Sequence, residues 1–129
     1  MAMPKKGYTD KLTHKEVIRL FDYGKYIVLP DEGLVCSGKG KPLYTFTGDR
    51  SAAKWVRLFD MPKVRAMPVA HCIWIYMTRT PIPKKFQIHH RNLDMTDNRW
   101  CNLYCLHKLD HEKLHSSAGV DDLIVEAPF

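Results

Sequence analysis

Short runs of β-prone residues separated by turn residues fill residues 26–58, and this pattern limits the fold most strongly. The runs cover residues 26–29, 34–36, 43–47 and 55–59. Proline, aspartate and glycine at 30–33, and glycine with lysine at 38–41, are typical of turns between strands. Short strands joined by tight turns pair with their sequence neighbours, so we predict a small antiparallel β-meander here.

The segment before these strands carries the start signal of a helix. Thr13 and Glu16 form a capping box, in which each side chain accepts a hydrogen bond from the other residue's backbone N–H. Apolar residues then recur on one helical face, at Val17, Ile18 and Phe21. We therefore predict a helix over 14–23, ended by Gly24.

Residues 69–77 fit two kinds of secondary structure. By composition, 73–76 favours a strand. Helical spacing of i, i+3, i+4, i+7 and i+8 is nevertheless followed by Val69, Cys72, Ile73, Tyr76 and Met77. Pro68 suits the first turn of a helix, so we predict a buried helix over 68–78. Prolines at 81 and 83 then lead into an extended segment at 86–90.

The chain of 129 residues is short enough to be a single domain. Apolar residues make up 45% and charged residues 26%, which allows a packed core, and no stretch approaches the ~20 apolar residues that cross a bilayer. We expect an α+β fold without membrane association. The net charge of +6 favours a polyanionic partner.

The four cysteines form no Cys-x-x-Cys pair, and the N-terminal residues include no apolar signal segment. This combination is typical of reduced thiols in a cytoplasmic protein. The first residues, 1–12, are polar and are predicted to be a flexible arm. The last, 118–129, form a tail to which the sequence assigns no chemistry.

Five of the seven histidines lie between His89 and His115. His111 and His115 are four residues apart on a helix predicted at 108–117, so they share one face and could hold a metal ion together. His89 and His90 are adjacent on an extended segment, so they point to opposite faces. One of the two histidines could therefore bind a metal ion while the other acts as a general base. Each pair on its own is more typical of surface histidines than of a metal site or an active site.

The segment 88–115, IHHRNLDMTDNRWCNLYCLHKLDHEKLH, resembles the HNH nuclease family, whose site is a β-hairpin crossed by one helix around a single metal ion (the ββα-metal motif). Asp97-Asn98-Arg99 followed by Cys101-Asn102-Leu103 is similar to the family's Asn-Asn-Arg-x-Glu-Asn-Leu run. Upstream, 69–71 and 81–83 look like the helix and Pro-x-Pro entry of the phage and intron homing branch. The resemblance implies an HNH core over 69–117, preceded by a helix and meander at 13–68 that could contact DNA.

The resemblance also implies roles for individual residues. His89 matches the first metal ligand, and His111 and His115 match ligands from the helix. His90 matches the general base that takes a proton from the attacking water. Asn102 matches the asparagine that ties the loop together and helps to hold the base.

Asn98 and Arg99 match family residues that shape the loop or meet the DNA backbone. Independently of the resemblance, the basic residues Lys84, Lys85, Arg91 and Arg99 lie around the predicted site, where they could contact DNA phosphates. The chain departs from the family pattern where Arg91-Asn92 replaces the usual residues after the histidine pair, and where Cys101 replaces a glutamate. These departures concern loop geometry and lie outside the catalytic positions.

Together these features predict a metal-dependent DNA endonuclease of homing type, which nicks or cuts double-stranded DNA in a bacterial host cell and is phage-encoded. One divalent ion is expected, Mg²⁺ or Mn²⁺ for catalysis, whereas histidine nitrogens suit Zn²⁺ or Ni²⁺. The alternative is a non-catalytic DNA-binding or interaction module in which zinc is structural. An intact His90 argues against that alternative, because a structural zinc site needs no base beside its ligand.

Overall fold

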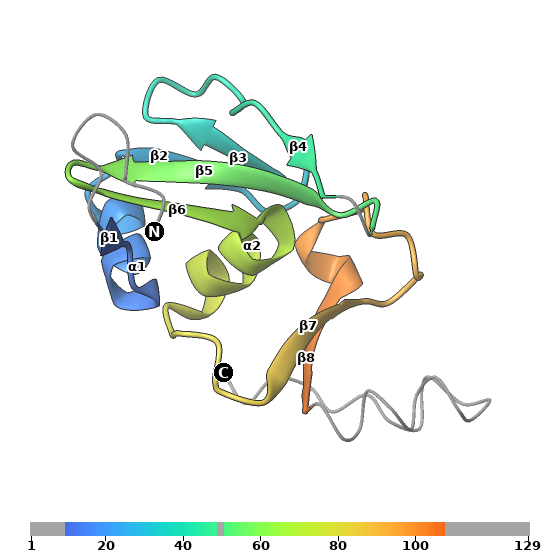
Figure 1. The fold of residues 1–129 in the computed structure, drawn as a ribbon. Coiled ribbons are helices and arrows are strands. Elements are labelled where there is room, and N and C mark those ends of the chain that lie inside the picture. The colour runs from blue at the N-terminus through green and yellow to red at the C-terminus, as the bar shows by residue number, and fades with distance from the viewer. Residues whose placement is uncertain (1–9, 49–50, 108–129) are drawn as a thin grey trace.

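The computed structural model describes residues 10–48 and 51–107 and has the α+β architecture expected from the sequence (Figure 1). In chain order the elements are β1 (Asp10–Lys11), α1 (His14–Asp22), β2 (Tyr26–Leu29), β3 (Leu34–Ser37), β4 (Phe46–Thr47), β5 (Lys54–Asp60), β6 (Lys63–Pro68), α2 (Val69–Thr78), β7 (Phe86–His90), a 3₁₀ turn (Trp100–Asn102) and β8 (Leu103–His107). The helix predicted over 108–117 and the tail at 118–129 lie outside the described residues.

The antiparallel strands predicted over 26–58 are present, but they belong to two sheets. β2 and β3 form a hairpin of their own, and β4 pairs with β5 in a four-stranded sheet of order β1-β6-β5-β4. β6 was not predicted from the sequence, and it pairs antiparallel with β5 along its whole length. Charged and apolar side chains alternate over residues 63–66, a strand signal that lies just before the predicted helix.

β1 shows that the N-terminal segment is ordered earlier than we expected. Residues 10–12 were assigned to a flexible arm, yet β1 pairs in parallel with β6. Leu12 is fully buried in the core, and its carbonyl accepts a hydrogen bond of 3.0 Å from Arg65. The pairing with β6 and the burial of Leu12 together hold this segment against the core.

α1 begins as predicted. Thr13 is the N-cap, its side chain accepts from the backbone N–H of Glu16, and Glu16 accepts from the backbone N–H of Thr13. The buried face consists of Val17, Leu20 and Phe21. Gly24, with φ of +74°, follows the helix in the left-handed conformation that glycine adopts without strain.

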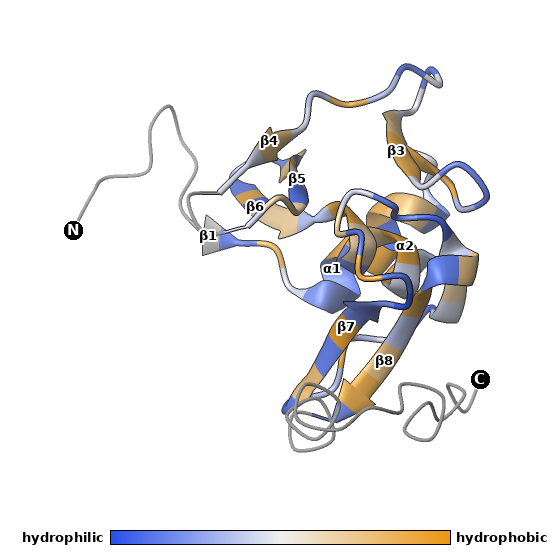
Figure 2. Ribbon diagram, turned by 90° about the vertical axis from the view of Figure 1, so that its right-hand side faces the viewer, coloured by the Kyte–Doolittle hydropathy of each residue, from blue (hydrophilic) through white to orange (hydrophobic). Residues whose placement is uncertain are grey.

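α2 confirms the helical interpretation of residues 69–77. Its middle residues, from Cys72 to Ile75, are fully buried, and Trp74 is the largest of the fully buried side chains. Figure 2 shows α2 in orange tones at the centre of the molecule. α2 contacts both helix α1 and the strands on either side of it, including β7 (Figure 1). A helix that is apolar all round is typical of such a central position.

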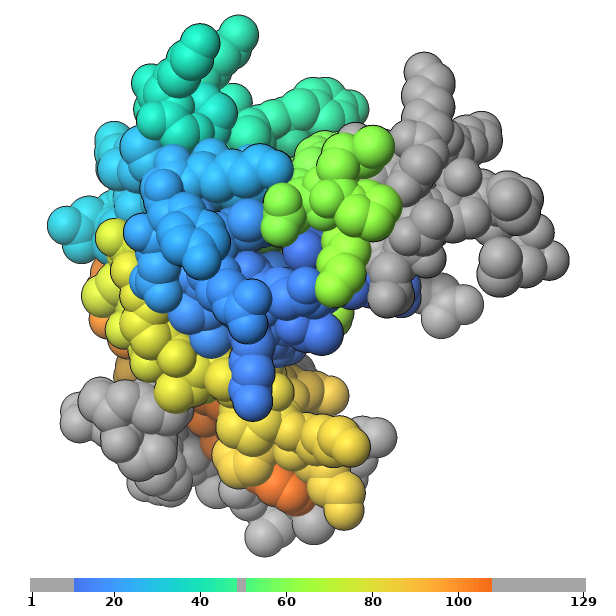
Figure 3. Space-filling model, turned by 90° about the vertical axis from the view of Figure 1, so that its left-hand side faces the viewer, coloured from blue at the N-terminus to red at the C-terminus, as the bar shows by residue number. Residues whose placement is uncertain are grey.

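The segment after α2 is fastened to α1. Figure 3 shows α1 (blue) beside the segment at about 78–85 (yellow). His14 is half-buried, and its Nδ1 accepts a hydrogen bond of 3.2 Å from the backbone N–H of Ile82. Arg79 also forms an ion pair of 3.2 Å with Asp22. These contacts fix the direction in which the chain enters β7.

Candidate functional site

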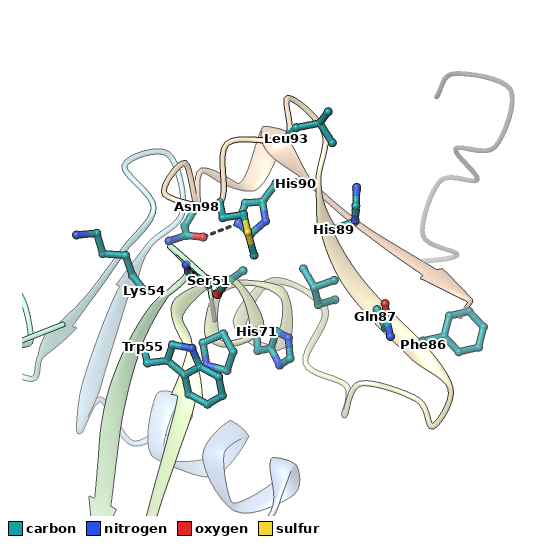
Figure 4. A pocket seen from close by; sticks show the side chains of 15 residues that line it. Ser51, Lys54, Trp55, His71, Phe86, Gln87, His89, His90, Leu93 and Asn98 are labelled. Carbon is teal, nitrogen blue, oxygen red and sulfur yellow. Dashed lines mark hydrogen bonds between the residues drawn. The ribbon is translucent and has the colours of Figure 1, made fainter. Parts of the chain in front are cut away.

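The β7–β8 hairpin presents its adjacent histidines to different surroundings. His89 is opposite Tyr104 and His90 is opposite Leu103 in the antiparallel register. Residues on one face, including Ile88 and Leu103, pack on the main core. Figure 4 shows His90 on this inner side and His89 on the other side of β7, as the strand alternation predicts.

Asn98 holds the ring of His90. His90 Nε2 lies 2.8 Å from Asn98 Oδ1, and both side chains are buried (Figure 4). An amide oxygen can only accept a hydrogen bond, so Nε2 must carry the proton in this pair. Nδ1 of the neutral ring therefore keeps its lone pair. The contact fixes the tautomer of His90 that can accept a proton at Nδ1.

Asn102 ties the two ends of the β7–β8 loop together but does not hold His90. Its buried side chain accepts from the backbone N–H of Asn92 at 2.9 Å and donates to the carbonyl of Asp97 at 2.8 Å. Its own carbonyl accepts from Arg91 N–H at 2.7 Å. The loop-tying role implied by the family resemblance fits this geometry. Contact with the base ring is made by Asn98, which the resemblance had placed among loop-shaping residues.

Arg99 is bound to its neighbour Asp97. Its Nε and Nη2 donate to the two carboxylate oxygens of Asp97 at 2.8 and 2.7 Å. The Arg99 guanidinium lowers the pKa of the Asp97 carboxyl far below its usual range. Asp97, a departure from the family's asparagine, thus fastens the loop through a bidentate pair.

The turn between β2 and β3 is pressed against this loop. The carbonyl of Pro30 accepts a hydrogen bond of 2.8 Å from the backbone N–H of Trp100. Gly33 has φ of +70°, and a Cβ at this position would lie 2.7 Å from the carbonyl carbon of Asn98 and 2.8 Å from the nitrogen of Arg99. Only a glycine allows this approach. The position of Asn98 therefore depends on the N-terminal half of the chain.

A cavity of about 730 Å³ lies between β7 and the end of the four-stranded sheet, next to His90 (Figure 4). Trp55 lines it from β5, Phe86 from β7 and His71 from α2. Burial, with smaller contributions from the positive charges of His14 and Arg65, lowers the pKa of His71 to about 4. His71 is therefore neutral at physiological pH.

The outer face of the hairpin holds His89 and Tyr104 in contact. Their ring centroids are 5.3 Å apart in an edge-on arrangement, and the Arg91 guanidinium carbon lies 5.5 Å from the Tyr104 ring centroid. Tyr104 is buried, and its hydroxyl has no hydrogen-bond partner among the residues that the structure describes. Burial raises the pKa of the Tyr104 phenol, and the charge of Arg91 opposes this effect.

The remaining predicted residues are divided between the surface and the undescribed part of the chain. Lys84 and Lys85 form an exposed turn before β7, and Arg91 is exposed after it. His111 and His115 lie outside the described residues. Over 10–48 and 51–107, no three His, Cys, Asp or Glu side chains gather as a metal site. Over the same ranges, no helix is long and apolar enough to span a bilayer.

Comparison with known proteins supports the family resemblance. Residues 69–113 match the family model described as HNH endonuclease. A solved structure, titled "DNA binding and cleavage by the HNH homing endonuclease I-HmuI", is 21% identical with a TM-score of 0.58. The match covers 77% of this chain and 57% of that chain, so this protein spans little more than half of it. No curated protein matches.

The family match covers the part of the molecule that holds the candidate site. The family match begins with α2 and includes the β7–β8 hairpin, which holds His89, His90, Asn98 and Asn102. The structural match extends over a larger share of the chain and indicates a common fold. Residues 69–113 thus carry the HNH endonuclease pattern within a fold shared with an HNH homing endonuclease, which confirms the resemblance noted in the sequence.

Proposed function

We propose that this protein is a metal-dependent HNH endonuclease that hydrolyses phosphodiester bonds in double-stranded DNA. The observation that carries the proposal is the pair formed by His90 and Asn98. A buried imidazole with a fixed tautomer, next to a cavity of about 730 Å³, is what a general base requires. A purely structural hairpin has no need of this arrangement.

In the proposed reaction, Nδ1 of His90 accepts a proton from the attacking water. Asn98 Oδ1 accepts the hydrogen bond from Nε2–H throughout, so it stabilises the imidazolium that forms. An imidazole with a free ring nitrogen can take this proton directly, which is why histidine is the most common general base in enzymes. Asn102 keeps the loop closed around this pair by joining Asn92 to Asp97.

His89, His111 and His115 would hold the divalent ion. His89 is half-buried on the outer face of the hairpin, where its ring contacts that of Tyr104, and its imidazole offers the nitrogen donor that divalent transition metals accept. Nitrogen ligands favour Zn²⁺ or Ni²⁺, whereas Mg²⁺ or Mn²⁺ prefer oxygen and would need an open site. When bound, the ion supplies positive charge to the scissile phosphate and the leaving oxygen.

DNA would be attracted by the net charge of +6 and held by exposed cations near the site. Arg91, Lys84 and Lys85 are the best placed of these. Arg99 contributes less to phosphate binding, because Asp97 neutralises its guanidinium. Homing-type cutting, nicking or double-strand, and action in the cytoplasm of a phage-infected bacterial cell are parts of this proposal.

The direct test is cleavage of supercoiled plasmid by the purified protein with Mg²⁺, Mn²⁺, Ni²⁺ or Zn²⁺. His90→Ala should abolish cleavage and keep metal affinity, whereas His89→Ala and His111→Ala should lose both. Added imidazole should restore part of the His90→Ala activity, because it can replace the missing base. Equal activity of wild type and His90→Ala would reject the assignment in favour of a structural-zinc module.

A further inference from the structure

Leu93 combines a strained backbone with an exposed apolar side chain. Its φ is +66°, in the left-handed region that glycine adopts freely and that strains a residue with a side chain. The side chain is 63% exposed, so burial offsets little of this strain. Among the residues that the structure describes, the other non-glycine residues with positive φ are Arg79 and Lys85, whose side chains are polar. Leucine at this position therefore needs a reason that glycine would not meet.

The loop that carries Leu93 is fixed by its own polar groups. The backbone N–H of Leu93 donates to the carbonyl of His90 at 3.0 Å. Asn92 Oδ1 accepts from the backbone N–H of Asp94 at 2.9 Å. The Asp94 carboxylate in turn accepts from the backbone N–H and the hydroxyl of Thr96 at 3.0 and 2.6 Å. These bonds hold Leu93 in place beside the proposed base, and they turn the acidic group next to Leu93 toward the loop.

Leu93 and Met95 form an apolar edge of the cavity that also contains His90. Both side chains line this cavity, and Met95 is 39% exposed. Figure 4 shows Leu93 at the tip of the loop, beyond the end of β7. The exposed cation Arg91 precedes it, where it can meet a phosphate. A phosphate contact needs only the cation, so the apolar tip indicates a second kind of contact, with the apolar faces of stacked bases.

We propose that Leu93 is a wedge that enters the base stack next to the phosphodiester bond that is cut. This inference rests on the proposed function, because it requires that His90 acts on double-stranded DNA. Apolar side chains inserted between base steps partly unstack them and kink the duplex. Steps that unstack easily, TA and CA/TG, are therefore preferred at the cut position. Leu93 thus adds a sequence preference without a hydrogen bond to any base.

The test compares Leu93→Gly with a control at equal exposure. Leu93→Gly removes the wedge and suits the positive φ, so its melting temperature should be unchanged or raised. Met61→Ala is the control, because Met61 is 62% exposed but lies in the β5–β6 turn, outside the cavity lining. The cut positions of wild type are first mapped on plasmid. A duplex with one mapped site then carries 2-aminopurine, which fluoresces more strongly when unstacked, beside the scissile phosphate.

Wild type and Met61→Ala should show a rise in fluorescence before cutting in single-turnover stopped-flow experiments, and Leu93→Gly should show none. Leu93→Gly should also cut the paired duplex about 10-fold or more slowly, because it does not favour the unstacked step. A mismatch at that step, which is already weakly stacked, should restore most of the lost rate.

Three results would each overturn the inference and leave the nuclease assignment standing. These are no fluorescence rise with wild type, cutting of the paired duplex by Leu93→Gly at the wild-type rate, and a defect in Leu93→Gly that is the same on paired and mismatched duplexes. Failure of wild type to cut plasmid with any divalent ion would overturn both the inference and the proposed function.

Discussion

His90 Nε2 and Asn98 Oδ1 are 2.8 Å apart, and they join the last residue of β7 to the far side of the loop that follows it. The contact spans eight residues and closes the loop over the inner face of the hairpin. It determines which ring nitrogen of His90 is protonated. The chemistry proposed for this protein therefore depends on a single amide oxygen.

Replacement of Asn98 tests this dependence. Asn98→Ala leaves the base in place without a fixed tautomer, so plasmid cleavage should fall by roughly 10–100-fold. Asn98→Asp keeps an acceptor oxygen in the same place, so it should retain much more activity than Asn98→Ala. A wild-type rate in Asn98→Ala would contradict the role assigned to Asn98.

Gly33 tests whether the β2–β3 turn sets the position of the loop. Gly33→Ala should lower cleavage by at least 10-fold, because its Cβ would collide with the backbone of Asn98 and Arg99. Gly24→Ala is the matched control, since φ is also positive there but no atom lies within 4 Å of the added Cβ. Backbone strain should cost each variant about 1–2 kcal/mol of stability, and the collision should make the loss larger in Gly33→Ala. Equal activity in the two variants would show that the turn does not influence the site.

His71 predicts a pH dependence of stability. Burial lowers its pKa to about 4, below the value of 6.5 expected in the unfolded chain, so protons bind preferentially to the unfolded state. The favourable contribution of neutral His71 is complete above pH 6.5 and is lost as the pH falls from 6.5 towards 4.

The measurement is urea unfolding of wild type and His71→Gln at pH 7.5 and 4.5. The stability of wild type relative to the variant should decrease by about 2–3 kcal/mol between these values. Carboxylates titrate in both proteins and cancel in the difference. A pH-independent difference would mean that His71 is not desolvated in the folded state.

Arg91 and Arg99 should differ in their effect on DNA binding, although only eight positions separate them. Arg91→Ala should weaken binding to a duplex and reduce the slope of log affinity against log salt concentration by about 1. Arg99→Ala should change that slope much less, because Asp97 already pairs with the guanidinium. Fluorescence anisotropy over a range of salt concentrations measures both slopes. Equal slope changes would show that the ion pair with Asp97 opens when DNA binds.

Local signals in the sequence predicted much of the fold. The capping box at Thr13 and Glu16 fixed the start of α1, and helical spacing of apolar residues identified α2 correctly. The antiparallel pairing of β7 with β8 also follows the expected pattern. Each of these elements is specified by residues close together in the chain. Pairing between distant segments was not predictable in this way, as the parallel contact of β1 with β6 shows.

In the candidate site, too, contacts that depend on how the chain folds back could not be predicted from the sequence. The adjacent histidines and the loop-tying Asn102 follow from motif spacing, and the structure places them at one end of the hairpin. The partner of the His90 ring could not be chosen between Asn98 and Asn102 from spacing, because the choice depends on how the loop folds back. The half-buried His14 was also missed, since its partner Ile82 lies 68 residues away.

The contact between Gly33 and the backbone of Asn98 has a consequence for how this motif could be transferred between proteins. A graft of residues 69–113 onto a foreign scaffold would carry the histidines and asparagines but not the β2–β3 turn against which their loop rests. Such a chimera should bind metal better than it cuts DNA, unless the recipient supplies an equivalent support. Residues 69–113 contain the candidate functional side chains, but the β2–β3 turn supports the loop that positions them.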